Sequence, residues 1–432
     1  MSNNGGTNPW LLAPVVALAA FMEVLDISIA NVALQHIAGS LSVSQEESTW
    51  ILTSYLISNA IVLPISGWLS TLMGRKRFFL GCIAGFSLSS LLCGIAPSLP
   101  LLILFRTLQG ATGGGLQPAS QAILADAFPP RQRGMAFAFY GMAVVFAPAI
   151  GPTLGGWITD NASWHWVFLI NVPVGIVLFL LTEALVQDSR EYTEARKARL
   201  ADGFSVDYVG LGLLALGLGF LQVVLDRGQQ SDWFDSQGIV AMTVVFVLAL
   251  GGFVVWELRQ RHPVVDLHLF RNPNFLFGNI LMFLLGFILL GSTVLIPVYV
   301  QSMLGYTAMD AGLVISPGGF AVMLAMPIVG RLISHVDARW LIIFGLTVCA
   351  AALYHMSGFN TQTDYATIAL ARVFQAIGLG FLFIPITTVA YVGLPAEKTD
   401  NASAIINLSR NLGGSVGISV AITVLARRTQ SH

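Results

Sequence analysis

The sequence predicts an all-α integral membrane protein built from two similar helical halves. Of its residues 55% are hydrophobic and only 10% are charged, against roughly 25% charged residues in soluble proteins. Apolar runs of about 20 residues, the length that crosses a bilayer, recur between short charged or Pro/Gly-rich breaks. Pieces of the first half also recur in the second half at a nearly constant spacing.

The composition excludes several classes of protein. A formal net charge of -1 indicates no polyanionic partner, so nucleic acid is set aside. Cys82, Cys93 and Cys349 lie within apolar runs, without the spacing of a disulfide framework or a metal site. The first apolar run lacks a basic leader and contains Glu23 and Asp26, so we expect a spanning helix and no cleaved signal peptide. No Ser/His/Asp arrangement lies at membrane depth, so we expect neither an enzyme nor a cofactor.

Long apolar runs predict thirteen spanning helices, and an odd number places the two chain ends on opposite sides of the membrane. Because the chain stops soon after the last run, we expect a further helix to be missing. The expected spans are 11–36, 49–71, 79–97, 100–125, 136–159, 165–186, 206–226, 238–257, 275–301, 310–334, 340–358, 364–393 and 401–426.

Basic residues predict a cytoplasmic N-terminus, because cytoplasmic loops of membrane proteins carry an excess of Lys and Arg. This orientation leaves only Arg227, Arg427 and Arg428 outside. It places fifteen basic residues inside: Arg75, Lys76, Arg77, Arg131, Arg133, Arg190, Arg196, Lys197, Arg199, Arg259, Arg261, Arg271, Arg331, Arg339 and Lys398.

Four units follow from these runs. Residues 1–186 form an N-terminal half of six helices, and residues 187–205 form a charged cytoplasmic linker. Residues 206–262 carry two inserted helices. Residues 263–432 form the C-terminal half, with five helices present and the sixth absent.

The internal repeat keeps one register at three landmarks. The segment from Gly67 to Lys76 is echoed by 330–339 at an offset of 263, while Arg106-Thr-Leu-Gln109 and Pro129 are echoed by Arg372-Val-Phe-Gln375 and Pro395 at 266. These offsets span an even number of helices, so the halves share one orientation and a cavity between them is the natural substrate site. Chance recurrence of such short patterns is the alternative.

Ionisable residues at membrane depth are costly, and are functional candidates by default. Glu23 and Asp26 share one helix face, and a carboxyl group in a partly dry cavity can switch by binding a proton. A structural hydrogen-bond acceptor is the alternative for Asp26, and contact with cationic substrates for Glu23. Arg106 keeps its charge and needs a partner, either to tune a carboxylate or to join two helices. For Arg372 and Arg410 a structural role is favoured.

Polar amides on these helices are expected to line the cavity, together with nearby Met and Phe side chains. Most of the aromatic residues will instead pack or face lipid. The amides are Asn31, Gln35, Asn59, Gln109, Gln117 and Gln121.

The fifth span carries small residues at 147, 151 and 155, which let another helix approach closely, and prolines that can kink it. A generic packing groove is the alternative to a dedicated motif. The residues concerned are Pro148, Gly151, Pro152, Gly155 and Gly156. The glycine triplet 113–115 lacks the following Lys of a phosphate loop and is expected within a spanning helix.

The loop after the second span is basic. It either contacts neighbouring helix ends or acts only as a solvated orientation signal. Its residues are Gly67, Gly74, Arg75 and Lys76.

Several tracts together are similar, over nearly the whole chain, to the fourteen-spanning drug:proton antiporters of the major facilitator superfamily. These tracts are Leu25-Asp26-Ile-Ser-Ile-Ala-Asn31-Val-Ala-Leu34, Arg106-Thr-Leu-Gln-Gly110, Gly151-Pro152-Thr-Leu-Gly155-Gly156-Trp157, Trp164-His-Trp-Val-Phe-Leu-Ile-Asn171-Val-Pro173-Val-Gly175 and Leu225-Asp-Arg-Gly-Gln-Gln-Ser-Asp-Trp233-Phe.

The resemblance implies a twelve-helix core with two inserted helices that exports hydrophobic or amphipathic drugs across the bacterial inner membrane in exchange for protons. It gives Arg106 a role in proton transfer and makes 147–156 the motif at which the halves meet. In Gram-negative members it implies a periplasmic adaptor protein and an outer-membrane channel as partners. The sequence departs from the pattern by lacking the fourteenth helix and by carrying Thr71 where an acid is usual, which leaves open whether this loop forms a conformational latch.

The leading hypothesis is an alternating-access antiporter in which Asp26, with Glu23, takes up protons from outside and releases them inside in exchange for drug. Export of a single endogenous metabolite is one alternative, which the breadth of substrates would distinguish. A transport-dead membrane receptor or scaffold is another, which proton flux on adding drug would distinguish.

Overall fold

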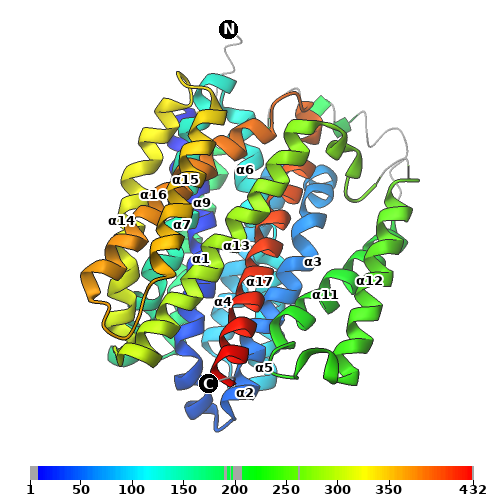
Figure 1. The fold of residues 1–432 in the computed structure, drawn as a ribbon. Helices are drawn as coiled ribbons and strands as arrows, with labels where there is room; N and C mark the ends of the chain where they lie inside the picture. The colour runs from blue at the N-terminus through cyan, green and yellow to red at the C-terminus, as the bar shows by residue number, and fades with distance from the viewer. Residues whose placement is uncertain (1–7, 189–191, 195, 198–206, 261–262, 431–432) are drawn as a thin grey trace.

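The computed structural model describes residues 8–188, 192–194, 196–197, 207–260 and 263–430, and every regular element within these ranges is a helix. The long helices stand side by side, and the first and last of them start at the same end of the molecule and run to the opposite end (Figure 1). Within the described residues, twelve spans are long and apolar enough to cross a membrane. Each of the twelve matches a span that the apolar runs predict.

The helices fall into an N-terminal bundle, a C-terminal bundle and a separate pair. The N-terminal bundle contains α1 (Pro9–Leu41), α2 (Gln45–Ser48), α3 (Trp50–Met73), α4 (Arg75–Gly94), α5 (Leu99–Gly113), α6 (Leu116–Ala127), α7 (Pro130–Asn161), α8 (His165–Leu169) and α9 (Asn171–Leu185). The pair is α11 (Tyr208–Arg227) and α12 (Gln237–Glu257), with η1 (Trp233–Asp235) between them. The C-terminal bundle contains η2 (Leu267–Arg271), α13 (Pro273–Leu304), α14 (Ala308–Leu332), α15 (Ala338–Met356), α16 (Tyr365–Ala390), η3 (Ala396–Lys398) and α17 (Thr399–Gln430).

Polar residues start several of the helices where the apolar runs begin. The side chain of Asn8 accepts a hydrogen bond from the backbone of Trp10, and Pro9 occupies the first position of α1, where its missing N–H is not needed. Thr307 and Asp310 form a reciprocal capping box at the start of α14. These caps pair backbone donors that a membrane could not hydrate.

The expected span 100–125 is wrong as a single helix, because the chain breaks at Gly114 and Gly115 into α5 and α6. The break lies tightly against neighbouring helices: an added Cβ at Gly114 would lie 2.8 Å from the carbonyl oxygen of Asn59, and one at Gly115 would lie 2.6 Å from Sγ of Cys82. The glycine triplet therefore serves close packing.

The two bundles meet along α7 and α14 and where α17 packs on α3 and α6. Glycines allow these contacts: an added Cβ at Gly67 would lie 2.9 Å from the backbone of Asn401, and one at Gly312 would lie 2.6 Å from Oγ1 of Thr153. The α11–α12 pair stands beside α3 and α17, with α11 between α12 and the bundles (Figure 1). The inserted helices thus add to the side of the molecule.

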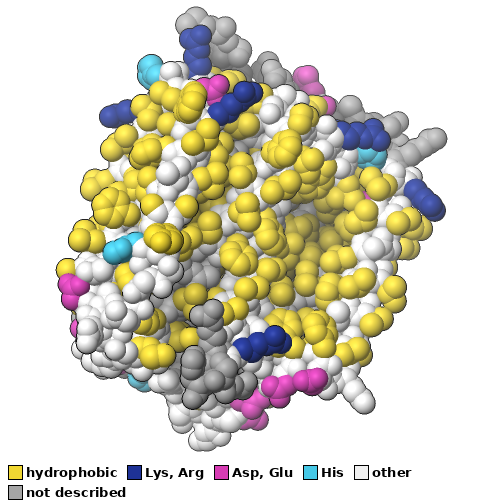
Figure 2. Space-filling view, viewed as in Figure 1, with side chains coloured by type: hydrophobic (Ala, Val, Ile, Leu, Met, Phe, Trp, Pro, Cys, Tyr) yellow, Lys and Arg dark blue, Asp and Glu magenta, His cyan; other side chains and the backbone are white. Residues whose placement is uncertain are grey.

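The surface matches this arrangement. Charged side chains gather at the two ends of the visible face, and the belt between them is largely hydrophobic (Figure 2). Such a belt is what a bilayer core requires. The expected linker 187–205 lies largely outside the described residues, and the boundaries of the four expected units stay a prediction.

Inside the C-terminal bundle, α13 and α17 pack so closely that we expect a single methyl group to separate them. An added Cβ would lie 2.0 Å from the carbonyl oxygen of Arg410 at Gly286, and 2.0 Å from that of Phe283 at Gly413. We expect Gly286→Ala and Gly413→Ala each to destabilise the protein by about 1–3 kcal/mol, the usual cost of overpacking. Thermal unfolding in detergent measures the effect. Gly251→Ala is the control, because no atom lies within 4 Å of the added Cβ there; equal melting temperatures for all three variants would contradict the expectation.

Candidate functional site

A buried ion pair joins the first span to the fourth. The guanidinium of Arg106 on α5 donates to Oδ2 of Asp26 on α1 at 2.5 Å, and both side chains are fully buried. Nε of Arg106 donates to the backbone carbonyl of Ile51 at 3.2 Å. The ring of Tyr55 lies 4.3 Å from the guanidinium carbon, a cation–π distance. The structure therefore brings the predicted acid and its permanent cation into direct contact.

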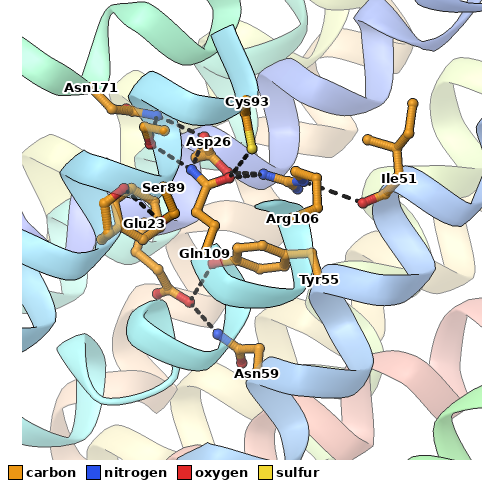
Figure 3. A network of polar contacts seen from close by, with 12 residues as sticks. Glu23, Asp26, Ile51, Tyr55, Asn59, Ser89, Cys93, Arg106, Gln109 and Asn171 are labelled. Atoms are coloured by element: carbon orange, nitrogen blue, oxygen red, sulfur yellow. Dashed lines mark hydrogen bonds and ion pairs between the residues drawn. The ribbon is translucent and has the colours of Figure 1, made fainter. Parts of the chain in front are cut away.

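Neutral amides complete the shell around Asp26 (Figure 3). Nε2 of Gln109 donates to Oδ1 at 3.0 Å, and Nδ2 of Asn171 on α9 donates to the same oxygen at 2.6 Å. The carbonyl of Gln109 also accepts from Arg106 at 2.7 Å. Both oxygens of Asp26 thus have close donors, one of them charged, as a buried carboxylate needs.

Glu23 lies one turn earlier on α1, with a different set of partners. Its carboxylate accepts from Nδ2 of Asn59 at 2.9 Å, from the hydroxyl of Tyr55 at 3.3 Å (Figure 3) and from Nε2 of Gln117. Glu23 is 1% exposed, yet it forms no ion pair with any described residue. Its hydrogen-bond partners are therefore neutral donors, while the positive charge of Arg410 acts on it without direct contact.

Gln117 forms hydrogen bonds with both bundles. Its side-chain nitrogen faces Glu23, while its oxygen accepts from Arg410 on α17 and from the hydroxyl of Tyr140 at 3.3 Å. The same hydroxyl lies 3.1 Å from Oδ1 of Asn407 on α17, so its one proton is shared between these two oxygens. The amide is held in one orientation by a carboxylate on one side and a cation on the other.

The same chain of hydrogen bonds extends to Gln121. Its side-chain oxygen accepts from Nδ2 of Asn407 at 2.9 Å and from the hydroxyl of Tyr391 at 3.4 Å. A polar path of buried groups thus runs from Glu23 in the N-terminal bundle through the interface to α16 and α17. Four of the six predicted amides, Asn59, Gln109, Gln117 and Gln121, belong to these networks.

The remaining two amides lie apart from the others. Asn31 and Gln35 are further along α1 and are exposed, and neither takes part in the hydrogen bonds described above. Their place in a substrate cavity stays a prediction.

The proline and glycine motif of α7 packs on α1. Pro152 has no N–H to donate to the carbonyl of Pro148, and the hydroxyl of Ser28 on α1 donates to that carbonyl at 3.4 Å. Gly151 and Gly155 leave room for the same turn of α1: an added Cβ at Gly151 would lie 2.2 Å from Oγ of Ser28. No atom lies within 4 Å of an added Cβ at Gly156. The opposite side of α7 faces α14, so this helix links the carboxylate-bearing helix to the other bundle.

The basic loop is part of a cross-bundle cluster at the end where α1 begins. Arg75 is 3% exposed; Nε pairs with Asp400 on α17 at 2.8 Å and Nη1 pairs with Asp126 on α6 at 3.1 Å. Thr71 donates to the carbonyl of Gly67 at 3.0 Å. Position 71 carries a threonine and no acid, and Arg75 pairs with Asp126 and Asp400 instead.

The neighbouring Lys76 holds the end of the first bundle. Its backbone N–H donates to Asp188 at 3.0 Å, and its ammonium pairs with Glu183 at 3.4 Å. Burial raises the pKa of the Asp188 carboxyl, and the hydrogen bond from Lys76 opposes that rise.

Some members of the networks carry no signal in the sequence. Tyr55, Tyr140 and Tyr391 look like core aromatics, and Asn407 is one of several polar residues in its span, so nothing in the sequence singles it out. Asn171 falls within a tract of the family resemblance, which is the one signal that points to it.

Comparison with known proteins agrees with this architecture. The model of the Major Facilitator Superfamily matches residues 16–418. The multidrug export protein EmrB of Haemophilus influenzae is 43% identical over 98% of this chain and 81% of its own length. The fatty acid resistance protein FarB of Neisseria gonorrhoeae is 38% identical over 96% of this chain and 81% of its own length.

A solved transporter shares the fold. The proton:xylose symporter XylE superimposes with a TM-score of 0.69 at 16% identity, over 98% of this chain and 90% of that protein. The resemblance drawn from the sequence tracts is thereby confirmed. The chain is a multi-pass protein of the bacterial inner membrane, and it belongs to the Major Facilitator Superfamily, whose members are transporters and not enzymes.

Proposed function

We propose that this protein exports hydrophobic and amphipathic drugs across the inner membrane in exchange for protons, with its N-terminus in the cytoplasm. Relatives that are 38–43% identical are named for multidrug export and for fatty acid resistance. The excess of basic residues at the end where α1 begins supports the orientation. Breadth of substrate would separate this proposal from export of a single endogenous metabolite.

One observation carries the proposal: a buried carboxylate, Glu23, is connected through a single amide, Gln117, to a cation of the opposite bundle, Arg410. Alternating access requires that the two bundles rearrange relative to each other. A proton that changes the hydrogen bonds of Gln117 therefore changes a contact between the parts that must move. A receptor or scaffold has no need of such a connection.

In this proposal Asp26 and Glu23 have different roles. Protonating Asp26 would break its ion pair and leave Arg106 as a buried unpaired cation, which is costly. Protonating Glu23 breaks no ion pair with a described residue. We therefore assign the exchangeable proton to Glu23, and to the Asp26–Arg106 pair the task of fixing α1 against α5 beside it.

In this proposal, protonation of Glu23 weakens a hydrogen bond between the two bundles. The ionised carboxylate accepts from Gln117 and so directs the amide oxygen toward Arg410. A protonated carboxyl group carries its own O–H donor and can turn the amide round. The oxygen then leaves Arg410, the bond between the bundles weakens, and access can alternate.

At the cytoplasmic end, Arg75 with Asp126 and Asp400 holds the bundles closed. This cluster has to open when drug enters from the cytoplasm. We also propose that export continues through a periplasmic adaptor protein and an outer-membrane channel, because the family resemblance implies both partners.

The first test replaces the side chain that carries the exchangeable proton. We expect Glu23→Gln to abolish drug uptake into inside-acidic proteoliposomes and to spare drug counterflow without a gradient, because the amide mimics the protonated acid and cannot release a proton. Uptake and counterflow of a fluorescent cationic drug measure both. Unchanged gradient-driven uptake would remove Glu23 from the coupling role.

The second test concerns the fixed pair. We expect Asp26→Asn to lower stability by about 3–5 kcal/mol, since it leaves Arg106 buried without a counter-charge. Thermal unfolding in detergent measures the loss. The control is Asp160→Asn: Asp160 pairs with His36 at 3.7 Å on the exposed surface, where such pairs contribute about 0–1 kcal/mol. An Asp26→Asn variant as stable as the control would contradict the assignment.

The third test opens the cytoplasmic cluster. We expect Asp400→Asn to slow transport severalfold while drug affinity is retained, because the closed form loses the buried bond between Arg75 and α17. Asp126→Asn is the matched control, since Asp126 is more exposed and lies in the same bundle as Arg75. Transport rates and equilibrium binding give the comparison. A variant with a normal rate, or with equal losses in rate and affinity, speaks against a gating role.

A further inference from the structure

The C-terminal bundle contains a second buried arginine in the position that Arg106 occupies in the first. At the repeat offset of 266, Arg106 and Gln109 correspond to Arg372 and Gln375. The local geometry repeats as well: each arginine donates from Nη1 to its glutamine at 2.7 Å. The internal repeat is therefore present in the side-chain contacts as well as in the sequence.

The counter-charge does not repeat. At the same offset, Asp26 of α1 corresponds to Ser292 of α13. Arg372 donates to Oγ of Ser292 at 2.8 Å and to Oγ1 of Thr293 at 2.9 Å. No described carboxylate forms an ion pair with Arg372, which is 5% exposed. The bundle thus holds a permanent cation that only neutral groups meet.

The aromatic cover is missing too. At the offset of 263 that relates α3 to α14, Tyr55 corresponds to Gly318. The ring of Tyr55 lies over Arg106, whereas the side chain of Arg372 lies directly against the glycine, where an added Cβ would be 2.9 Å from Cγ of the arginine. Arg372 therefore lacks both the carboxylate and the aromatic ring that stabilise the charge of Arg106.

Two donors at this place remain unused. Nε of Arg372 and Nε2 of Gln375 are buried and make no hydrogen bond with the described part of the chain. The hydroxyls of Ser292 and Thr293 donate to the carbonyl of Leu289, at 3.1 and 2.6 Å, so they can only accept from Arg372. An uncompensated guanidinium with a neighbouring free amide N–H is the donor set that a carboxylate accepts from best.

We propose that Arg372 and Gln375 form a binding site for the carboxylate group of an amphiphilic anion, in the place that Asp26 fills in the other bundle. The guanidinium supplies the charge that the carboxylate needs, and the unpaired amide N–H of Gln375 supplies a second donor. This inference rests on the proposed export function and names one substrate class for it. Cationic drugs do not need this site.

The test uses a carboxylate built into the protein. Ser292→Asp places an acid where the repeat has Asp26, so it should occupy Arg372 and exclude the ligand; Ser292→Asn is the neutral control of the same size. Dodecanoate and dodecyltrimethylammonium are the probes, because they share a tail and differ in charge. Binding to the full chain in lipid nanodiscs is measured by thermal shift and by titration.

We expect dodecanoate to bind the wild-type protein and Ser292→Asn alike, and to bind Ser292→Asp at least about tenfold more weakly, as loss of a charge-assisted contact predicts. Dodecyltrimethylammonium should bind all three equally. Without ligand, Ser292→Asp should melt above Ser292→Asn, because it neutralises a buried cation. Equal dodecanoate binding by the two variants, or equal loss of both probes, would overturn the proposal.

Transport separates this inference from the function on which it rests. Gradient-driven uptake of dodecyltrimethylammonium by the wild-type protein reports export alone, since a cation does not occupy the proposed carboxylate site. If that uptake is absent from the wild-type protein while dodecanoate still binds in a manner that depends on residue 292, the export proposal fails and the site stands. Uptake of the cation with 292-independent dodecanoate binding gives the opposite result.

Discussion

A guanidinium that cannot lose its proton, placed where water cannot reach it, constrains much of this structure. Arg106 recruits Asp26 from α1, a backbone carbonyl from α3 and the ring of Tyr55. Asp26 in turn requires Gln109 and Asn171, which brings in α9. Four helices are thus fixed by the needs of one charge. Because packing in a membrane gains little from the hydrophobic effect between helices, such polar contacts give the bundle its specific arrangement.

The same constraint explains why two acids one turn apart differ in chemistry. Asp26 is tied to a cation and is best left ionised, while Glu23 faces Asn59, Tyr55 and Gln117, which can also serve a neutral acid after small rotations. Only Glu23 is adjacent to an amide that reaches the opposite bundle. Sequence reasoning gave more weight to Asp26, because it lies in the tract shared with the family. In the proposed mechanism the exchangeable proton is carried by Glu23, because its carboxylate contacts an amide that reaches the opposite bundle.

The sequence predicts well whatever depends on a long apolar run or on an isolated charge. Twelve spans follow from the runs, and the demand of Arg106 for a carboxylate follows from elementary electrostatics. The break at Gly114 could not be foreseen, because it depends on the backbone of α3 lying against it. Tyr140 and Asn407 could not be assigned either, since a buried hydroxyl or amide is recognised only when its partner on another helix is known. For Asn31 and Gln35 the residue type alone suggested a cavity, and their exposed side chains take no part in the buried networks, so their place in a cavity stays a prediction.

The repeat shows how one scaffold supports two different chemistries. Both bundles keep an arginine and a glutamine in the same geometry, so the backbone arrangement does not depend on the acid. Among the described residues deep within the two bundles there are three arginines, Arg106, Arg372 and Arg410, and two acids, Glu23 and Asp26, so positive charge is in excess even when both acids are ionised. A proton on Glu23 increases this excess, and an anion beside Arg372 would reduce it. Proton uptake and anion binding would then favour each other electrostatically, whereas a cationic drug would compete with the proton; the charge of the substrate would therefore set how each is coupled to the proton.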